Sequence, residues 1–257
     1  MRKRPLEELI SDEVWYRHFE NAYIELGDLK PPTKFYKISI CTTSMNRLYD
    51  LRQTFIKNIE DNIDYPNLEF VLLNYNSKDE IDDWAKDLPP IVKYYKTTRP
   101  KYYNMAHSRN CAFRLASGDV VNSVDADHFT NKGFATQINL IANNHPNTIY
   151  VKSRQRNRGR ISLFKDDFMR LGGYDEGLKD YGFEDEDLIN RGRHLGLKVV
   201  RYGGEYCKVV DTHKIHPVAN YDNKEWRFTQ DRNAILSLYN LHRKKYVANQ
   251  GYDWGKL

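Results

Sequence analysis

The sequence predicts an α/β protein in which a mainly parallel sheet is flanked by helices. Apolar runs and segments of helical periodicity alternate from residue 37 to residue 124, as parallel strands joined by crossover helices require. The run 68–73 is almost continuously apolar, which is typical of a strand buried on both faces. Neither GxGxxG nor GxxxxGK[ST] occurs, which argues against a dinucleotide-binding fold or a P-loop.

Each element is predicted from its own residues. Residues 6–26 place apolar side chains on one helical stripe, and Gly27 can end that helix before Pro31 and Pro32. Strands are then expected at 37–41, 68–73, 91–95 and 120–124, with helices at 48–63, 79–87 and 105–116. Beyond residue 150 the alternation weakens, and one further helix is expected at 229–242. We expect an N-terminal helical extension (1–36), a single main domain (37–217) and a helical or irregular C-terminal tail (218–257).

The composition narrows the class of protein. Of the 257 residues, 40% are hydrophobic and 29% are charged, which is ordinary for a soluble globular protein. The net charge of +5 suits anionic ligands such as nucleoside diphosphates, and equally nucleic acid or an acidic membrane surface. The three cysteines have no CxxC spacing, so a zinc or disulfide framework is not indicated. With no apolar run near the ~18 residues of a membrane span and no apolar signal core, we expect a cytoplasmic protein; peripheral membrane contact stays open.

The motif Asp125-Ala126-Asp127 follows the last of the four predicted strands. Asp-x-Asp is common as an exposed turn, but two carboxylates at the end of a strand can also share Mg²⁺ or Mn²⁺, which prefer oxygen ligands. Polar residues also follow the first two strands, and ligands bind beyond the carboxyl ends of the strands in such sheets. These further polar residues are Thr42, Thr43, Asn46 and Arg47 after the first strand, and Asn74, Asn76, Ser77 and Asp79 after the second.

A third metal ligand should come from elsewhere in the chain. His213 follows a β-like run and is our choice, with His216 and His128 as rivals, although a given histidine is by default a core or surface residue. Arg109 could pair with a phosphate or with Asp125, or be solvated. The segment 152–165 holds six cations and no acid; a loop over an anionic substrate is favoured over RNA or DNA binding there, so no nucleic-acid partner is expected.

The acidic run 184–187 has two interpretations. Acids stabilise the first turn of a helix through its macrodipole, and that explains part of the pattern. It does not explain Tyr181-Gly182-Phe183 immediately before the run, an aromatic and tight approach to a helix N-terminus. Carboxylates crowded at such a place raise one another's pKa, and one of them can then deprotonate an incoming hydroxyl.

The ordered set of motifs resembles the GT-A glycosyltransferases, which use nucleotide-sugar donors and a metal held by a DxD motif. The N-terminal half is similar to the large inverting family 2 in the segments 40–47, 73–79, 107–110 and 118–127. The second half resembles the C-terminal domain shared by β-1,4-galactosyltransferases and bacterial chondroitin-type polymerases. Its matching segments are 172–176, 181–187 and 207–213. The resemblance extends over residues ~37–215 and implies a Rossmann-like GT-A fold.

The resemblance also implies a role for each matching residue. Catalysis is assigned to Asp185 as the base, with Glu184 on sugar hydroxyls. Mn²⁺ or Mg²⁺ is assigned to Asp127 and His213, with Asp125 shared between the metal and the diphosphate–ribose region. The nucleotide is assigned to Thr42, Thr43, Asn46, Arg47, Asn76, Arg109, Asp125 and Ala126.

The expected function is metal-dependent, inverting transfer of a hexose or N-acetylhexosamine from a UDP-sugar to a glycan or other hydroxyl acceptor. Two departures from the family pattern bear on which donor and acceptor are used: Tyr181 replaces a tryptophan and Phe183 replaces a glycine. The alternatives are a retaining GT-A transferase and a binding protein that keeps an inactive transferase fold. A sugar nucleotidyltransferase is disfavoured because the glycine-rich pyrophosphate loop is absent.

Overall fold

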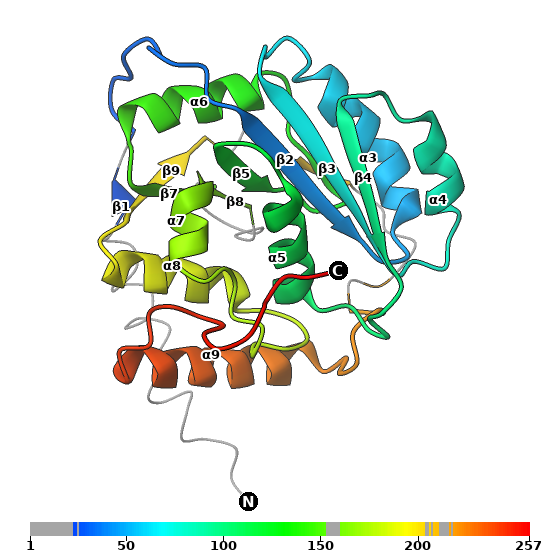
Figure 1. The fold of residues 1–257 in the computed structure, drawn as a ribbon, viewed down its shortest axis with the longest axis vertical. Coiled ribbons are helices and arrows are strands. Elements are labelled where there is room, and N and C mark those ends of the chain that lie inside the picture. The colour runs from blue at the N-terminus through cyan, green and yellow to red at the C-terminus, as the bar shows by residue number, and fades with distance from the viewer. Residues whose placement is uncertain are drawn as a thin grey trace, which may run out of the picture.

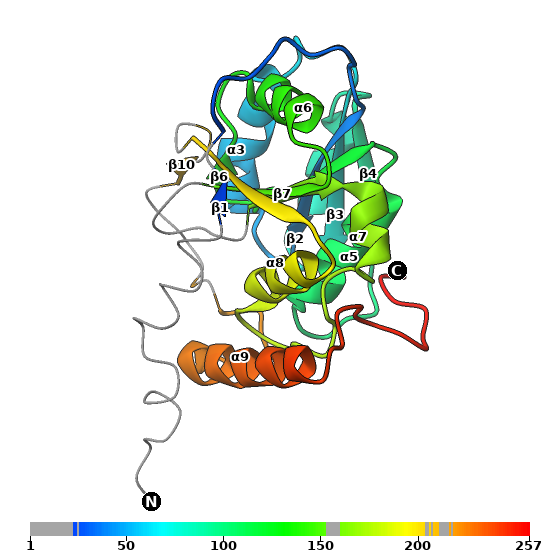
Figure 2. The same ribbon diagram turned by 90° about the vertical axis from the view of Figure 1, so that its left-hand side faces the viewer.

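The protein is described here by a computed structural model that covers residues 23–24, 26–152, 160–203, 206, 208–210, 216 and 218–257. An eight-stranded sheet in the order β1-β9-β7-β8-β5-β2-β3-β4 carries helices on both faces (Figures 1 and 2). The strands of this sheet are β1 Tyr23–Ile24, β2 Ile38–Ser44, β3 Leu68–Tyr75, β4 Val92–Thr97, β5 Val120–Ser123, β7 Thr148–Lys152, β8 Ile161–Phe164 and β9 Lys198–Tyr202. A second, small sheet pairs β6 (His128–Phe129) with β10 (Lys208–Val209). The predicted mainly parallel α/β fold is confirmed.

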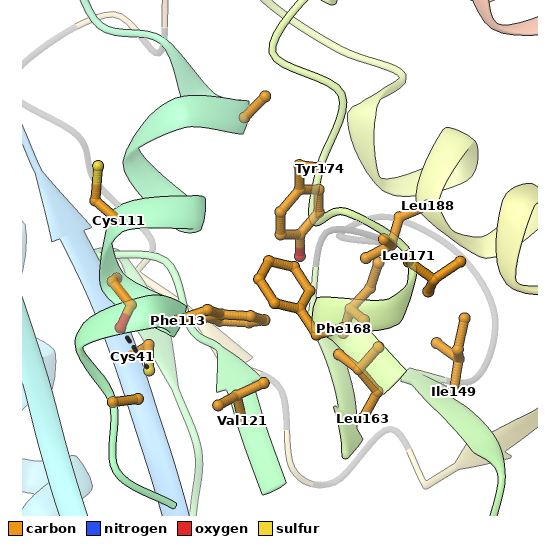
Figure 3. Close-up of a cluster of buried hydrophobic side chains, with 14 of the residues drawn as sticks. Cys41, Cys111, Phe113, Val121, Ile149, Leu163, Phe168, Leu171, Tyr174 and Leu188 are labelled. Atoms are coloured by element: carbon orange, nitrogen blue, oxygen red, sulfur yellow. Dashed lines mark hydrogen bonds between the residues drawn. The ribbon is translucent and has the colours of Figure 1, made fainter. Parts of the chain in front are cut away.

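The helices divide between the two faces of the sheet. They are α3 Leu48–Glu60, α4 Ile81–Trp84, α5 Met105–Leu115, α6 Phe134–Asn144, α7 Lys165–Arg170, α8 Glu184–His194 and α9 Trp226–His242, with a 3-10 turn at Ala85–Asp87. One apolar cluster joins β2 and β3 to α3 and α6. The other joins them to α5, α7 and α8, and Figure 3 shows Phe113 of α5 and Phe168 of α7 at its centre, with ring centroids 4.8 Å apart. No helix in the described part of the chain is long and apolar enough to span a membrane.

The half of the sheet formed by β5, β2, β3 and β4 follows the predicted alternation of strands and helices. Strand β2 pairs in parallel with both β3 and β5, and β3 pairs in parallel with β4. The register aligns Ser44 at the end of β2 with Asn74 near the end of β3. The carboxyl ends of these strands therefore open onto one edge, where the polar residues after each strand meet.

The other half of the sheet departs from simple alternation. Strand β8 runs antiparallel to both β5 and β7, whereas β7, β9 and β1 are parallel to one another. The helix predicted at 6–26 is wrong at Tyr23–Ile24, which pair with β9 as an edge strand; residues 6–22 and 25 lie outside the described residues. The helix predicted at 229–242 is confirmed as α9, which begins three residues earlier. The division of the chain into three parts stays a prediction.

A buried carboxylate fixes the opposite edge of the sheet. Glu69 of β3 accepts hydrogen bonds from the Ser39 hydroxyl and from the backbone amide and hydroxyl of Ser117, each at 2.6 Å, and Lys37 Nζ lies 3.4 Å away. Gly118 permits this approach, since a Cβ there would lie 2.3 Å from Ser39 Oγ. Burial alone would raise the pKa of Glu69, but the hydrogen bonds from Ser117 and Ser39 and the charge of Lys37 together lower it.

We predict that Glu69→Gln lowers the free energy of unfolding by about 1–3 kcal/mol at pH 7, because the new amide places N–H groups against donors. Because the pKa of Glu69 is lowered in the folded protein, the wild type should have the larger free energy of unfolding above the unfolded-state pKa of about 4.3. That difference should disappear as the pH falls through the folded-state pKa of Glu69. Urea unfolding at pH 7 and at pH 3 measures both effects. An equal difference between the two proteins at both pH values would contradict this account.

Candidate functional site

One cavity of about 470 Å³ lies where the strand ends of β2 and β5 meet the first turn of α8. It brings together predicted site residues from distant parts of the chain, because the parallel register places their strands side by side. Eight of these predicted residues line it: Thr43, Arg47, Arg109, Asp125, Ala126, Asp127, Glu184 and Asp185. The other lining residues are Met45, Tyr103, Met105, His128, Tyr181, Gly182, Phe183, Glu186, Val209, Asn220, Tyr221 and Gln230.

Arg109 joins two sides of this cavity. It belongs to α5, which is capped by the preceding residue: the Asn104 amide oxygen accepts a 3.0 Å hydrogen bond from the backbone N–H of His107. The Arg109 guanidinium is 3% exposed. It donates to Asp125 Oδ1 at 2.9 Å and to Glu184 Oε1 at 2.7 Å. One buried cation therefore connects the end of β5 to the first turn of α8.

The two carboxylates on Arg109 differ in their proton affinity. Burial would raise the pKa of Asp125, but the charges of Arg109 and then His128 outweigh it and hold this pKa at about 2. Burial, and next the neighbouring charge of Asp185, raise the pKa of Glu184 to about 7 against the opposing effect of Arg109. Asp125 is thus a permanent anion, whereas the ionisation of Glu184 depends on its bond with Arg109.

Asp125, Asp127 and His128 form a compact group of possible metal ligands, which we call the metal-type group. One ligand atom from each residue lies within 4.8 Å of the others. The Nε2 of His128 is 3.6 Å from Asp127 Oδ1, and its Nδ1 is 3.9 Å from Asp125 Oδ2. His128 is buried, and its Nδ1 has no hydrogen-bond partner in the described part of the chain. Arg47 donates to Asp127 Oδ2 at 3.2 Å and orients that carboxylate. Two carboxylates and an imidazole fit Mn²⁺ or Mg²⁺.

The predicted ligand His213 lies outside the described residues, so its role stays a prediction. Its sequence rival His216 is exposed, and it does not line the cavity. His128 is the one rival that the structure places beside both aspartates.

Three residues predicted to bind the nucleotide do not line the cavity. Thr42 is buried within β2. Asn46 has φ 56°, and its side chain donates to the Asn220 side chain at 2.8 Å; Asn76 has φ 60° and donates to the Pro100 carbonyl at 2.7 Å. Asparagine tolerates this left-handed backbone, so the two side chains shape the loops after β2 and β3. Their assignment to the nucleotide stays a prediction.

Sequence reasoning singled out Tyr181 but missed the rest of an aromatic wall of the cavity. Tyr103 shares a 2.6 Å hydrogen bond between its hydroxyl and that of Thr43, and its ring meets Tyr221 edge-on at 5.4 Å. The Tyr221 ring in turn lies 6.0 Å from Tyr181. Asn220 fixes this tail segment by donating to the Met45 carbonyl at 2.7 Å. The chain contains 19 tyrosines, which is a general signal of aromatic surfaces, but nothing in the linear pattern places the tail at the strand ends.

We predict that Arg109→Ala lowers the free energy of unfolding by about 3–5 kcal/mol, because it breaks a buried ion pair and leaves Asp125 and Glu184 without their shared partner. Arg170→Ala is the matched control: Arg170 is 51% exposed and pairs with Asp167 on the surface, so its loss should cost under about 1 kcal/mol. Chemical unfolding of both variants gives the comparison. Equal, small losses would show that Arg109 is not the structural bridge described above.

Comparison with known proteins supplies the family. The sequence model of glycosyl transferase family 2 matches residues 39–197. A mannosyltransferase from Pyrobaculum calidifontis in complex with GDP-Man and Mn²⁺ superimposes with a TM-score of 0.66 at 19% identity, over 90% of this chain and 71% of that chain. GalNAc-T7 with UDP, GalNAc and Mn²⁺ gives 0.63 at 13% identity, over 82% and 50%. S. aureus TarS in complex with UDP gives 0.53 at 16% identity, over 64% and 57%.

At these low sequence identities the superpositions show a shared fold and no more. The chain spans only about half the length of the second and third relatives. The resemblance of the second half to the β-1,4-galactosyltransferase type stays a prediction. The family match, in contrast, covers more than half of this chain. The protein therefore belongs to glycosyl transferase family 2 and is a transferase with the GT-A fold.

Proposed function

We propose that this transferase moves a hexose or N-acetylhexosamine from a UDP-sugar to a hydroxyl of a glycan or other acceptor, with metal dependence and inversion of the anomeric centre. The observation that carries the proposal is the bridge made by Arg109. It holds Asp125, which belongs to the group of possible metal ligands, and Glu184, which precedes Asp185, against one guanidinium in the lining of one cavity. A sugar diphosphate in that cavity would have its leaving group near Asp125 and Asp127 and a base in Asp185.

The metal would be held by Asp125 and Asp127 together with an imidazole, from His128 or from His213. When bound, Mn²⁺ or Mg²⁺ neutralises charge on the departing diphosphate. Arg47 keeps Asp127 oriented through its 3.2 Å hydrogen bond. The mannosyltransferase and GalNAc-T7 structures both contain Mn²⁺, which supports the same ion here.

Asp185 is the proposed base. It lies in the first turn of α8 and lines the cavity, and its Oδ1 accepts a 2.8 Å hydrogen bond from the Glu186 amide. The acceptor oxygen attacks the anomeric carbon as the carbon–oxygen bond to the diphosphate breaks on the opposite face. The bonding pair leaves with the diphosphate, and Asp185 takes the proton of the acceptor hydroxyl. One displacement therefore inverts the centre.

The donor is proposed to be a UDP-sugar. Two of the structural relatives are complexes with UDP, and one contains GDP-Man, so GDP-sugars are the competing class. Arg47 and Arg109 line the cavity in which the diphosphate of either donor would bind. We also propose that the protein is cytoplasmic and that its acceptor is a glycan or glycoconjugate.

We predict that Asp185→Asn lowers transfer by at least about 10²–10⁴-fold, since the amide cannot accept the acceptor proton, while donor binding changes little. Asp166→Asn makes the same chemical change at an exposed position on α7 and should have no effect. An assay of product formation measures the transfer rate, and calorimetric titration with the donor measures donor binding. Normal turnover by the Asp185 variant would refute the assignment of the base, and NMR showing a retained anomeric configuration would refute inversion.

We predict that UDP-sugars with Mn²⁺ raise the melting temperature, because a ligand that binds only the native state stabilises it. UDP-, GDP- and dTDP-sugars are compared with Mn²⁺ and with EDTA. The rise should vanish in EDTA and in Asp127→Asn; His128→Ala and His213→Ala then show which imidazole completes the site. Transfer at full rate in EDTA would overturn the metal role, and stabilisation by GDP-sugars alone would overturn the donor class.

A further inference from the structure

Helix α9 buries polar residues and exposes apolar ones. Its buried side chains are Thr229, Asn233 and Ser237, which recur every four residues on one face. Phe228 is 60% exposed and Tyr239 is 52% exposed. Buried polar groups are costly unless each one finds a hydrogen-bond partner. The place where α9 docks is therefore determined by specific polar partners and not by a hydrophobic stripe.

Those partners lie in the 179–183 loop, which leads directly into the first turn of α8. Asn233 Nδ2 donates to the carbonyls of Lys179 at 3.0 Å and Gly182 at 2.8 Å. The Thr229 hydroxyl lies 2.9 Å from the Tyr181 carbonyl, to which it donates.

The same polar face also reaches α8. The Ser237 hydroxyl donates to Asp187 Oδ1 at 2.7 Å, and Arg191 donates to the other oxygen of that carboxylate at 2.7 Å. Asp187 is fully buried, so this contact holds the first turn of α8 against α9. The three polar residues of α9 thus contact the loop and the helix that carry Tyr181, Glu184 and Asp185.

The backbone of the loop requires such support. Asp180, Gly182 and Phe183 have φ values of 64°, 94° and 76°. Residues other than glycine adopt this left-handed conformation at a cost, and it persists where the surroundings over-determine it. Gly182 also lies directly against α9, because a Cβ there would be 3.2 Å from Gln230 Cβ. The hydrogen bonds from α9 help to keep the loop in place, together with the 3.1 Å hydrogen bond from the Asn223 amide to Asp180.

We propose that Thr229, Asn233 and Ser237 are positioning residues: the first two act through the 179–183 loop and Ser237 acts through Asp187 of α8, and together they aim Tyr181, Glu184 and Asp185 into the cavity. The inference rests on the proposed function of that site. It makes the C-terminal tail a working part of the transferase, although α9 lies outside the segment that matches the family. Asp125 and Asp127 lie between β5 and β6, whereas the α9 hydrogen bonds described above go to the loop and to Asp187, so we expect nucleotide binding and sugar transfer to separate.

The test compares Asn233→Ala and Thr229→Val with Thr229→Ser, which restores the hydroxyl, and with Ile235→Ala on the 40% exposed outer face of α9. We expect Asn233→Ala and Thr229→Val to lower kcat about 10–100-fold, the usual effect of a small misplacement of reacting groups. The KM for the UDP-sugar identified by melting should stay within about 3-fold, because the hydrogen bonds that these variants remove go to the 179–183 loop and not to Arg47, Asp125 or Asp127. Thr229→Ser and Ile235→Ala should keep wild-type rates.

Hydrogen–deuterium exchange supplies a readout that needs no substrate. Amides of residues 179–187 should exchange about 10-fold faster in Asn233→Ala, while those of β2 and β3 stay protected. Wild-type kcat in both variants, or unchanged exchange in 179–187, would overturn the inference. A wild-type protein with neither turnover nor metal-dependent nucleotide binding would overturn the proposed function instead, and the exchange result would still decide whether α9 holds the loop. If Asn233→Ala does not fold, the Thr229 pair carries the comparison.

Discussion

The buried guanidinium of Arg109 is the contact on which the site depends. It is 3% exposed and holds two carboxylates that are distant in sequence, Asp125 at 2.9 Å and Glu184 at 2.7 Å. An ion pair of this kind is costly to bury, and removing one partner leaves an uncompensated charge. Its retention here is explained by geometry, because no smaller or singly donating side chain can fix both sides of the cavity at once.

The fold supplies the place for that bridge. Parallel pairing of β2 with β3 and β5 brings the carboxyl ends of these strands to one edge of the sheet. Helix α5 packs on the sheet and carries Arg109 into the lining of the cavity at these strand ends. The antiparallel β8 then turns the chain back, and α7 leads to the loop before α8. The acidic first turn of α8 is therefore presented to the strand ends by an element that sequence alternation alone does not predict.

The sequence predicted what local patterns can encode. Continuous apolar runs identified β2, β3 and β5, and a DxD motif at a strand end identified the metal-type group with Asp125 and Asp127 in one cavity. It failed at Tyr23–Ile24, where an isolated edge pairing overrides helical periodicity. Nor did it contain the left-handed backbones of Asn46 and Asn76 or their hydrogen bonds to Asn220 and Pro100, while their assignment to the nucleotide stays a prediction. Such contacts join segments far apart in sequence, so no local pattern contains them.

The buried face of helix α9 is polar, so the sequence of the tail does not predict which side of this helix packs against the protein. Methods that search for an apolar stripe orient a helix by its hydrophobic face, yet here Thr229, Asn233 and Ser237 are the buried residues. Thr229 and Asn233 donate to backbone carbonyls of the 179–183 loop, in which Asp180, Gly182 and Phe183 adopt positive φ, and Ser237 donates to the Asp187 carboxylate. The loop and the helix therefore specify each other. A polar interface of this kind tolerates little displacement, because every shift leaves a buried group unpaired, and that property suits a contact that must hold a catalytic turn in register.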